Sequence, residues 1–257
     1  MLLRRVREHL KTHNWLGVGV DLLIVILGVF LGTQVSNWNA ERLAHEAGDS
    51  YRARIVRDLE NNEGDLQGRA AYFAQVRVFA LQVLGDLDGS APLSDEQFLI
   101  AAYQATQIYP RPLTRGAYDE IQSVGALNTL GSIGTRDQVA NYYVGLETSE
   151  ATFRFVPPYR EIVRRVMPYA VQARIREACA EVMTTAAVGL ARLSLPERCT
   201  LGMDRAVLAR AARLLRTTPG LEQDVTRLLA DVDQKLIQIA RSQTRAQELA
   251  VQLSALR

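Results

Sequence analysis

Apolar residues recur at intervals of three and four along most of the chain, and no stretch shows sustained alternation with β-branched residues. This spacing is typical of amphipathic helices and not of half-buried strands. It predicts an all-α protein in which one N-terminal transmembrane helix continues into an external helical bundle. The first proline is Pro92, so a single helix can run from the apolar N-terminal segment until DLDGSAP, residues 86–92, ends it.

One face of this long helix carries a stripe of apolar residues beyond the membrane segment. The stripe consists of Tyr51, Ile55, Leu59, Leu66, Phe73, Val76, Ala80, Val83 and Leu87. Gly48, Gly64 and Gly68 interrupt the same region, and each costs about 1 kcal/mol relative to alanine in a helix interior. We therefore expect these glycines to be the weak points of the helix.

Capping signals mark the next helices. Ser94 with Gln97, and Thr135 with Gln138, have the capping-box spacing in which each side chain satisfies the other end's free N–H. Between these helices, residues 114–130 predict two short helical turns separated by a glycine. We expect that glycine, Gly125, to be a left-handed C-cap.

That turn has a predicted buried side of its own, formed by Tyr118, Ile121 and Val124. We interpret it as a core motif and not as a ligand pocket.

The C-terminal half predicts three further helices. The first begins at Pro157 and Pro158 and continues to Leu193 with a kink at Pro168, and the second spans 204–216. The last spans 219–257, with Thr218 as its N-cap. Its apolar positions alternate steps of three and four, with lapses at Lys235 and Ser242: Leu221, Val225, Leu228, Val232, Ile239, Ala246, Leu249, Leu253 and Leu256. Such a stripe is typical of a helix packed within a bundle or of a coiled-coil partner, and the bundle is our expectation.

The segment 15–35 is long and apolar enough to cross a bilayer, which needs about 20 such residues. Asp21 is its only charge, and Trp15 and Trp38 bracket it at the depth where interfacial aromatics lie. The leader, residues 1–14, is basic, whereas the stretch after the span is mainly acidic. The positive-inside rule then predicts a cytoplasmic N-terminus and a domain outside the cytoplasm, residues 36–257.

A cleaved signal peptide with the apolar core 22–32 is the alternative interpretation. No small-x-small site precedes Ser36, and Trp38 occupies the place where processing would occur. These features favour a retained signal anchor. In either case the external residues Cys179 and Cys199 are in an oxidising compartment, where they can form a disulfide or remain two buried thiols.

Charge is unevenly distributed outside the membrane. Residues 36–257 hold 26 basic and 26 acidic side chains, which gives no overall nucleic-acid signature. However, 36–100 has six basic against eleven acidic residues, whereas 154–216 has twelve against five. We expect these segments to pack together or to form separate solvated faces; a basic patch that meets anionic lipid or a polyanion is the alternative.

The external domain lacks the residues of common catalytic centres. His9, His13 and His45 are the only histidines, so residues 46–257 can form no histidine-based triad and no ordinary His-ligated zinc site. The cysteines lack metal-binding spacing. We therefore expect no catalytic, cofactor-binding or metal site, and an enzyme is the least favoured functional class.

Three stretches carry a resemblance to a known family. They are the acidic residue early in the span, the box QVSNWNAER at 34–42, and YDEIQSVG at 118–125 followed by Tyr142-Tyr143. Together they resemble an uncharacterised bacterial family of single-pass membrane proteins, a domain of unknown function. The resemblance covers 15–65 and 113–143, with Asp21 where glutamate is usual and Ser36 where asparagine is usual. The resemblance implies a protein of the bacterial inner membrane with a cytoplasmic N-terminus, a periplasmic domain and a helical fold, but it implies no activity.

Asp21 is the residue in the span that most needs a partner, because a lipid-exposed carboxylate costs up to about 3 kcal/mol. Snorkelling to the cytoplasmic interface is one explanation. A helix contact is another, since Gly28 and Gly32 form a small-xxx-small pair in the same sector of the helix as Asp21. A ring of Asp21 carboxylates around a cation path, with Gln34 also facing the pore, is the third.

The box beyond the span carries polar amides on either side of an aromatic anchor. The amides of Asn37 and Asn39 can cap or bridge neighbouring helices at the interface, while Trp38 fixes the depth; ordinary interfacial polarity is the simpler interpretation.

Two functional classes follow from these features. The first is a membrane-anchored helical interaction or scaffold protein that self-associates or holds another membrane protein. The second is a subunit of a small oligomeric channel or transporter. The predicted partners are the lipid bilayer and a second copy or another membrane protein, with no nucleic acid and no cofactor.

Overall fold

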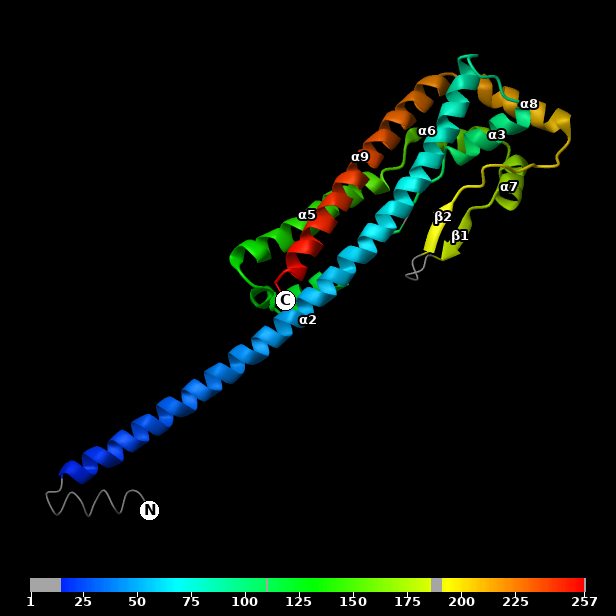
Figure 1. Cartoon of the computed structure of the whole chain (residues 1–257). Helices are drawn as coiled ribbons and strands as arrows, with labels where there is room; N and C mark the ends of the chain where they lie inside the picture. The colour runs from blue at the N-terminus through cyan, green and yellow to red at the C-terminus, as the bar shows by residue number, and fades with distance from the viewer. Residues whose placement is uncertain (1–14, 110, 186–190, 257) are drawn as a thin grey trace.

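A computed structural model describes residues 15–109, 111–185 and 191–256. Its main feature is α2 (Trp15–Leu87), a helix of 73 residues. In Figure 1 this helix forms a rod whose N-terminal part projects from a helical body, and the rest of the chain packs along its C-terminal part. The predicted all-α fold and the continuity of the long apolar N-terminal helix with further helices are confirmed.

The body is organised around the stripe on α2. Ile55, Leu59, Leu66, Phe73 and Val76 are each 1% exposed or less. The helix ends where predicted, because Gly89 has a φ of 79° and Asp86 accepts a hydrogen bond from the Leu93 N–H at 2.8 Å. The turn reverses the chain, so the following helix packs back against α2.

The last helix, α9 (Leu221–Ser254), runs beside α2 in the opposite direction and makes its largest interface. Its apolar stripe is buried from Leu221 to Leu253, so the expectation of bundle packing is confirmed. The two polar lapses, Lys235 and Ser242, are buried as well. The predicted N-cap of α9 is wrong. The N-cap is Gly220, which has a φ of 80°, and Thr218 contacts the start of the helix only through its backbone carbonyl, which accepts from the Leu221 N–H.

The next two helices, α3 (Asp95–Gln104) and α4 (Gly116–Ser123), follow their local signals. Ser94 forms the predicted capping box with Gln97. After α4, Gly125 has a φ of 68°, and the Ala126 and Gly125 N–H groups donate to the carbonyls of Ile121 and Gln122, as in a left-handed helix end.

The buried side predicted for this turn is only partly right. Tyr118 and Ile121 are buried, but Val124 is 61% exposed. Val124 is the C-cap residue, with a ψ of 3°, so it no longer follows the helical face. A short 3₁₀ helix, η1 (Leu127–Leu130), comes next.

Three helices follow η1: α5 (Ile133–Arg154), α6 (Pro158–Val166) and α7 (Tyr169–Ala178). Ser132 caps α5 by accepting a hydrogen bond from the Thr135 N–H at 3.2 Å, so the predicted start at Thr135 is three residues late. The predicted kink at Pro168 is a complete break between α6 and α7.

The helix predicted to continue to Leu193 is wrong, because α7 ends at Ala178 and an antiparallel hairpin follows. Its strands, β1 (Val182–Thr185) and β2 (Ala191–Ser194), pair Val182 with Ser194 and Thr185 with Ala191. The hairpin docks on α2, where the Gln75 amide donates to the Leu195 carbonyl at 3.2 Å and accepts from its N–H at 2.8 Å. This tertiary contact outweighs the weak helical pattern of the segment.

The chain then forms α8 (Arg205–Arg216), whose N-terminus is capped by Asp204. Arg216 lies over the ring of Phe98 and pairs with Asp86 at 2.7 Å and with Asp95 at 2.6 Å. The basic and acidic segments of the sequence therefore meet here inside one body.

Candidate membrane and helix-contact surface

The first third of α2 has its apolar side chains exposed. From Leu22 to Leu31 every large apolar side chain is between 48% and 63% exposed. The most apolar 18-residue window has a mean hydropathy of 2.3, and none of it is buried. A helix of this length and composition can cross a membrane. A core helix of a soluble domain would be covered by other elements, and this segment is not.

The helix-contact candidates lie on this bare segment. Gly28 and Gly32 have no atom within 4 Å of an added Cβ, so neither contacts another described part of the chain. Asp21 is partly exposed. At 100° per residue, Asp21, Gly28 and Gly32 lie within about 40° of one another around the helix axis. The structure thus keeps them on one uncovered face.

Gln34 does not share that face. Because α2 is one continuous helix, Gln34 lies about 140° around the axis from Asp21. The two side chains cannot both point toward the same symmetry axis. The structure therefore places Asp21 and Gln34 on different faces of the helix, whereas the channel hypothesis requires both to face the pore.

The amides of the interfacial box, Asn37 and Asn39, also lie on different faces of the helix. By the same geometry Asn39 falls on the side of Asp21, whereas Asn37 falls on the side of Gln34. Arg42 donates to the Asn39 side-chain oxygen at 3.3 Å and also lies 3.6 Å from Glu46. Trp38 is 67% exposed. These contacts support the helix itself and reach no other element.

Residues 36–47 form a neck of the helix, which no other element covers, between the apolar segment and the body. All of these residues are exposed, and at 1.5 Å per residue the neck is about 18 Å long. An isolated helix of this length is marginal in water, so it depends on the stable helix at each end. Residues 36–47 are therefore a part of the helix that no other described element supports.

The body begins at Gly48. A Cβ on Gly48 would lie 2.2 Å from the Thr129 carbonyl oxygen, so only glycine permits this approach of η1 to α2. One turn later, Arg52 donates to the carbonyls of Thr129 and Leu130 at 3.3 and 3.2 Å. In the sequence Gly48 is recognisable only as a weak point of the helix, because the carbonyl that requires a glycine there belongs to Thr129, far along the chain.

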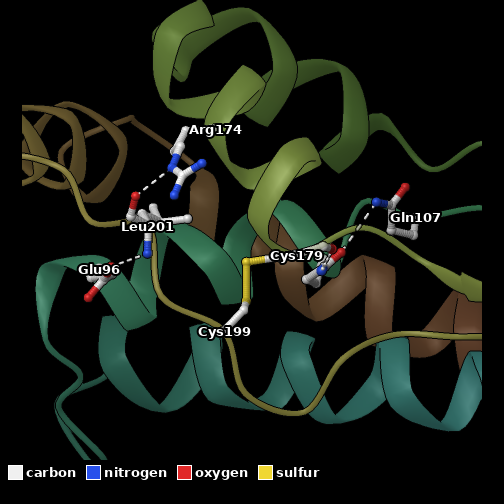
Figure 2. The surroundings of a disulfide bond; sticks show 7 residues. Glu96, Gln107, Arg174, Cys179, Cys199 and Leu201 are labelled. Carbon is white, nitrogen blue, oxygen red and sulfur yellow. Dashed lines mark hydrogen bonds between the residues drawn. A yellow bond between two sulfur atoms is a disulfide. The ribbon is translucent and has the colours of Figure 1, made fainter.

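The two cysteines are joined by a disulfide in the structure, with Cα atoms 5.6 Å apart. Figure 2 shows it linking the end of α7 to the segment before α8. Gln104 on α3 donates to the Cys179 carbonyl at 2.9 Å, and Arg174 donates to the Leu201 carbonyl at 2.6 Å. The bond closes the loop that contains the hairpin, and such bonds persist in oxidising compartments.

Comparisons with protein-family models, with curated proteins and with solved structures found no match for this chain. The resemblance to the uncharacterised membrane family therefore stays a prediction. Among the described residues, no group of three or more histidine, cysteine, aspartate or glutamate side chains is placed to hold a metal ion.

Proposed function

We propose that this protein is a membrane-anchored helical scaffold that self-associates along α2. The observation that carries the proposal is one continuous helix whose residues 22–47, from the apolar segment through the neck, are all exposed. Lipid can cover the apolar part. Lipid cannot cover the part of the neck beyond the interfacial Trp38, where Leu43 is 51% exposed.

A second copy of α2 satisfies both needs. Small residues let helix backbones approach closely in a membrane, and polar side chains gain hydrogen bonds across the interface. The face with Gly28 and Gly32 has Asp21 at one end and Asn39 at the other, so a parallel pair would bury a polar group at each end. The carboxylate would then have a protein neighbour instead of lipid.

The oligomeric state of the full-length protein in lipid nanodiscs tests this proposal. We expect Gly28→Leu with Gly32→Leu to shift crosslinked dimers or higher oligomers toward monomer, because leucine prevents close approach of the helices. Gly19→Leu is the matched control, since Gly19 lies about 160° from Asp21 on the same helix and is equally uncontacted. A monomeric wild type with no co-purifying partner, or equal effects of both changes, would contradict self-association by this face.

The channel hypothesis makes a different prediction for the same preparation. A cation path lined by Asp21 would give a conductance that Asp21→Asn reduces. A scaffold gives no such current. Its oligomer should be weakened less by Asp21→Asn than by Gly28→Leu with Gly32→Leu. The positions of Asp21 and Gln34 on different faces favour the scaffold.

A further inference from the structure

An open pocket of about 380 Å³ lies beside the disulfide, between α3, α6 and α7. Its wall includes Cys179 and the end of α3, and Figure 2 shows Gln107, another lining residue, on the Cys179 side of the bond. Three arginines line it: Arg160 and Arg164 from α6, and Arg176 from α7. The proposed membrane function does not use this site.

The three guanidinium groups converge on neutral acceptors. Arg164 donates to the Tyr103 hydroxyl and, at 2.9 Å, to Thr106 Oγ1. Arg160 donates to the Thr106 carbonyl, and Arg176 lies 3.4 Å from the Tyr103 hydroxyl. Within the described part of the chain, none of the three forms an ion pair, although ten other pairs are present there.

One carboxylate also lines the pocket, but it has another partner. Glu181 accepts a hydrogen bond from Tyr72 on α2. Three guanidinium groups and one carboxylate leave a net charge of about +2 on the pocket wall. Burial lowers the pKa of Arg164, and the neighbouring charges of Arg160 and Arg176 lower it further. The three positive guanidinium groups therefore lie close together, and the single carboxylate on the pocket wall does not balance their charge.

The geometry also leaves donors available. The Arg164 guanidinium carbon is 3.6 Å from the centre of the Tyr103 ring, and this stacking fixes its plane. The Tyr103 oxygen accepts from guanidinium groups, so its own hydrogen can be donated elsewhere. Arg160 and Arg176 each use one nitrogen in the contacts above, which leaves several N–H groups for a ligand.

We propose that this pocket binds the phosphate group of a small soluble molecule. A phosphate dianion matches the net charge of the wall, and arginine is the side chain whose paired N–H groups fit phosphate oxygens. The volume is at the lower end of small-molecule sites, which favours a compact ligand over a peptide segment.

This assignment rests on the proposed membrane placement of α2, which puts the pocket beyond the headgroups of that bilayer. Tyr72, which contacts the pocket residue Glu181, lies 37 residues beyond Val35 on the same helix, or about 55 Å along its axis. A phosphate in that bilayer cannot reach the pocket while the neck remains helical. The ligand is therefore free in the external compartment.

Calorimetric titration of the full-length protein in neutral-lipid nanodiscs with inorganic phosphate, at constant ionic strength, tests the proposal. We expect saturable binding, weakened about tenfold by Arg176→Gln, because a charge-assisted hydrogen bond is lost. Arg165→Gln is the matched control: Arg165 is exposed on α6, outside the pocket, and its loss should leave Kd unchanged. Circular dichroism verifies that each variant is folded.

The substitution Glu181→Gln is a second test, in which phosphate binding is expected to become stronger instead of weaker. It keeps an acceptor for Tyr72 but removes the negative charge, so phosphate should bind more tightly. Absence of binding to the wild type at millimolar phosphate would overturn the proposal, and so would equal binding by the Arg176 variant. Tighter binding of succinate than of phosphate would overturn the assignment of a phosphate ligand.

Discussion

Lys235 is a charged side chain buried in the body, on the face of α9 that packs against α2. It is 2% exposed, donates to the Phe155 carbonyl at 2.7 Å and lies 5.1 Å from the centre of the Phe73 ring. Burial lowers its pKa to about 8, and the nearby charge of Asp231 offsets only part of this effect. The carbonyl and the ring stabilise the ammonium, but they do not replace its full hydration.

This lowered pKa predicts an unusual pH dependence. Between pH 8 and 10 the unfolded lysine keeps its proton while the folded lysine loses it, so the free energy of unfolding should rise by about 1 kcal/mol per pH unit. Above pH 10 the rise should reverse, because burial raises the pKa of Tyr159 and only the unfolded tyrosine ionises there. Lys235→Met should abolish the rise.

Urea titrations followed by far-ultraviolet circular dichroism measure this effect, since both tryptophans lie outside the body. Arg227→Met is the control, because Arg227 is exposed on the same helix. If wild type and Lys235→Met show the same slope between pH 8 and 10, then Lys235 is not the group responsible.

At the scale of elements, local signals predicted local structures. The capping box at Ser94, the left-handed turn at Gly125 and the helix after Asp204 are correct because neighbouring residues determine them. The hairpin was not predictable in this way, since Gln75 and the disulfide hold it from distant parts of the chain. The pocket arginines were visible only as a basic segment, because their convergence depends on how α6 and α7 pack.

The disulfide should therefore stabilise one region more than the whole body. Closure of a loop with a sequence separation of 20 stabilises a protein by about 3 kcal/mol. We expect Cys179→Ser with Cys199→Ser to increase hydrogen exchange in 182–185 and 191–194, and to leave the exchange of α9 nearly unchanged. Reduction of the wild type should reproduce this pattern. Uniform loss of protection, or none, would contradict a local role.

At the scale of the whole molecule, the structure has three zones in sequence: an apolar helical segment, a neck that no other element covers, and a body that contains the disulfide (Figure 1). The all-α fold and the long apolar helix were predictable because they depend on periodicity and length. The neck was not, since a pattern of polar residues does not reveal which parts of a helix remain uncovered. Because the three zones follow one another in this order, labelling the two ends of the chain can test the orientation of the protein in a membrane.

We expect the body to lie outside the cytoplasm and the basic leader to lie inside, because arginine-rich ends are retained and the disulfide needs an oxidising compartment. A cysteine at Thr244, exposed on α9, should react with an impermeant maleimide in cells with a permeabilised outer membrane. A cysteine at His9 should react only after the inner membrane is opened. The native cysteines are bonded and give no background. The reverse pattern would invert the topology, and a mass lacking the leader and span would show that the segment is a cleaved signal peptide instead of an anchor.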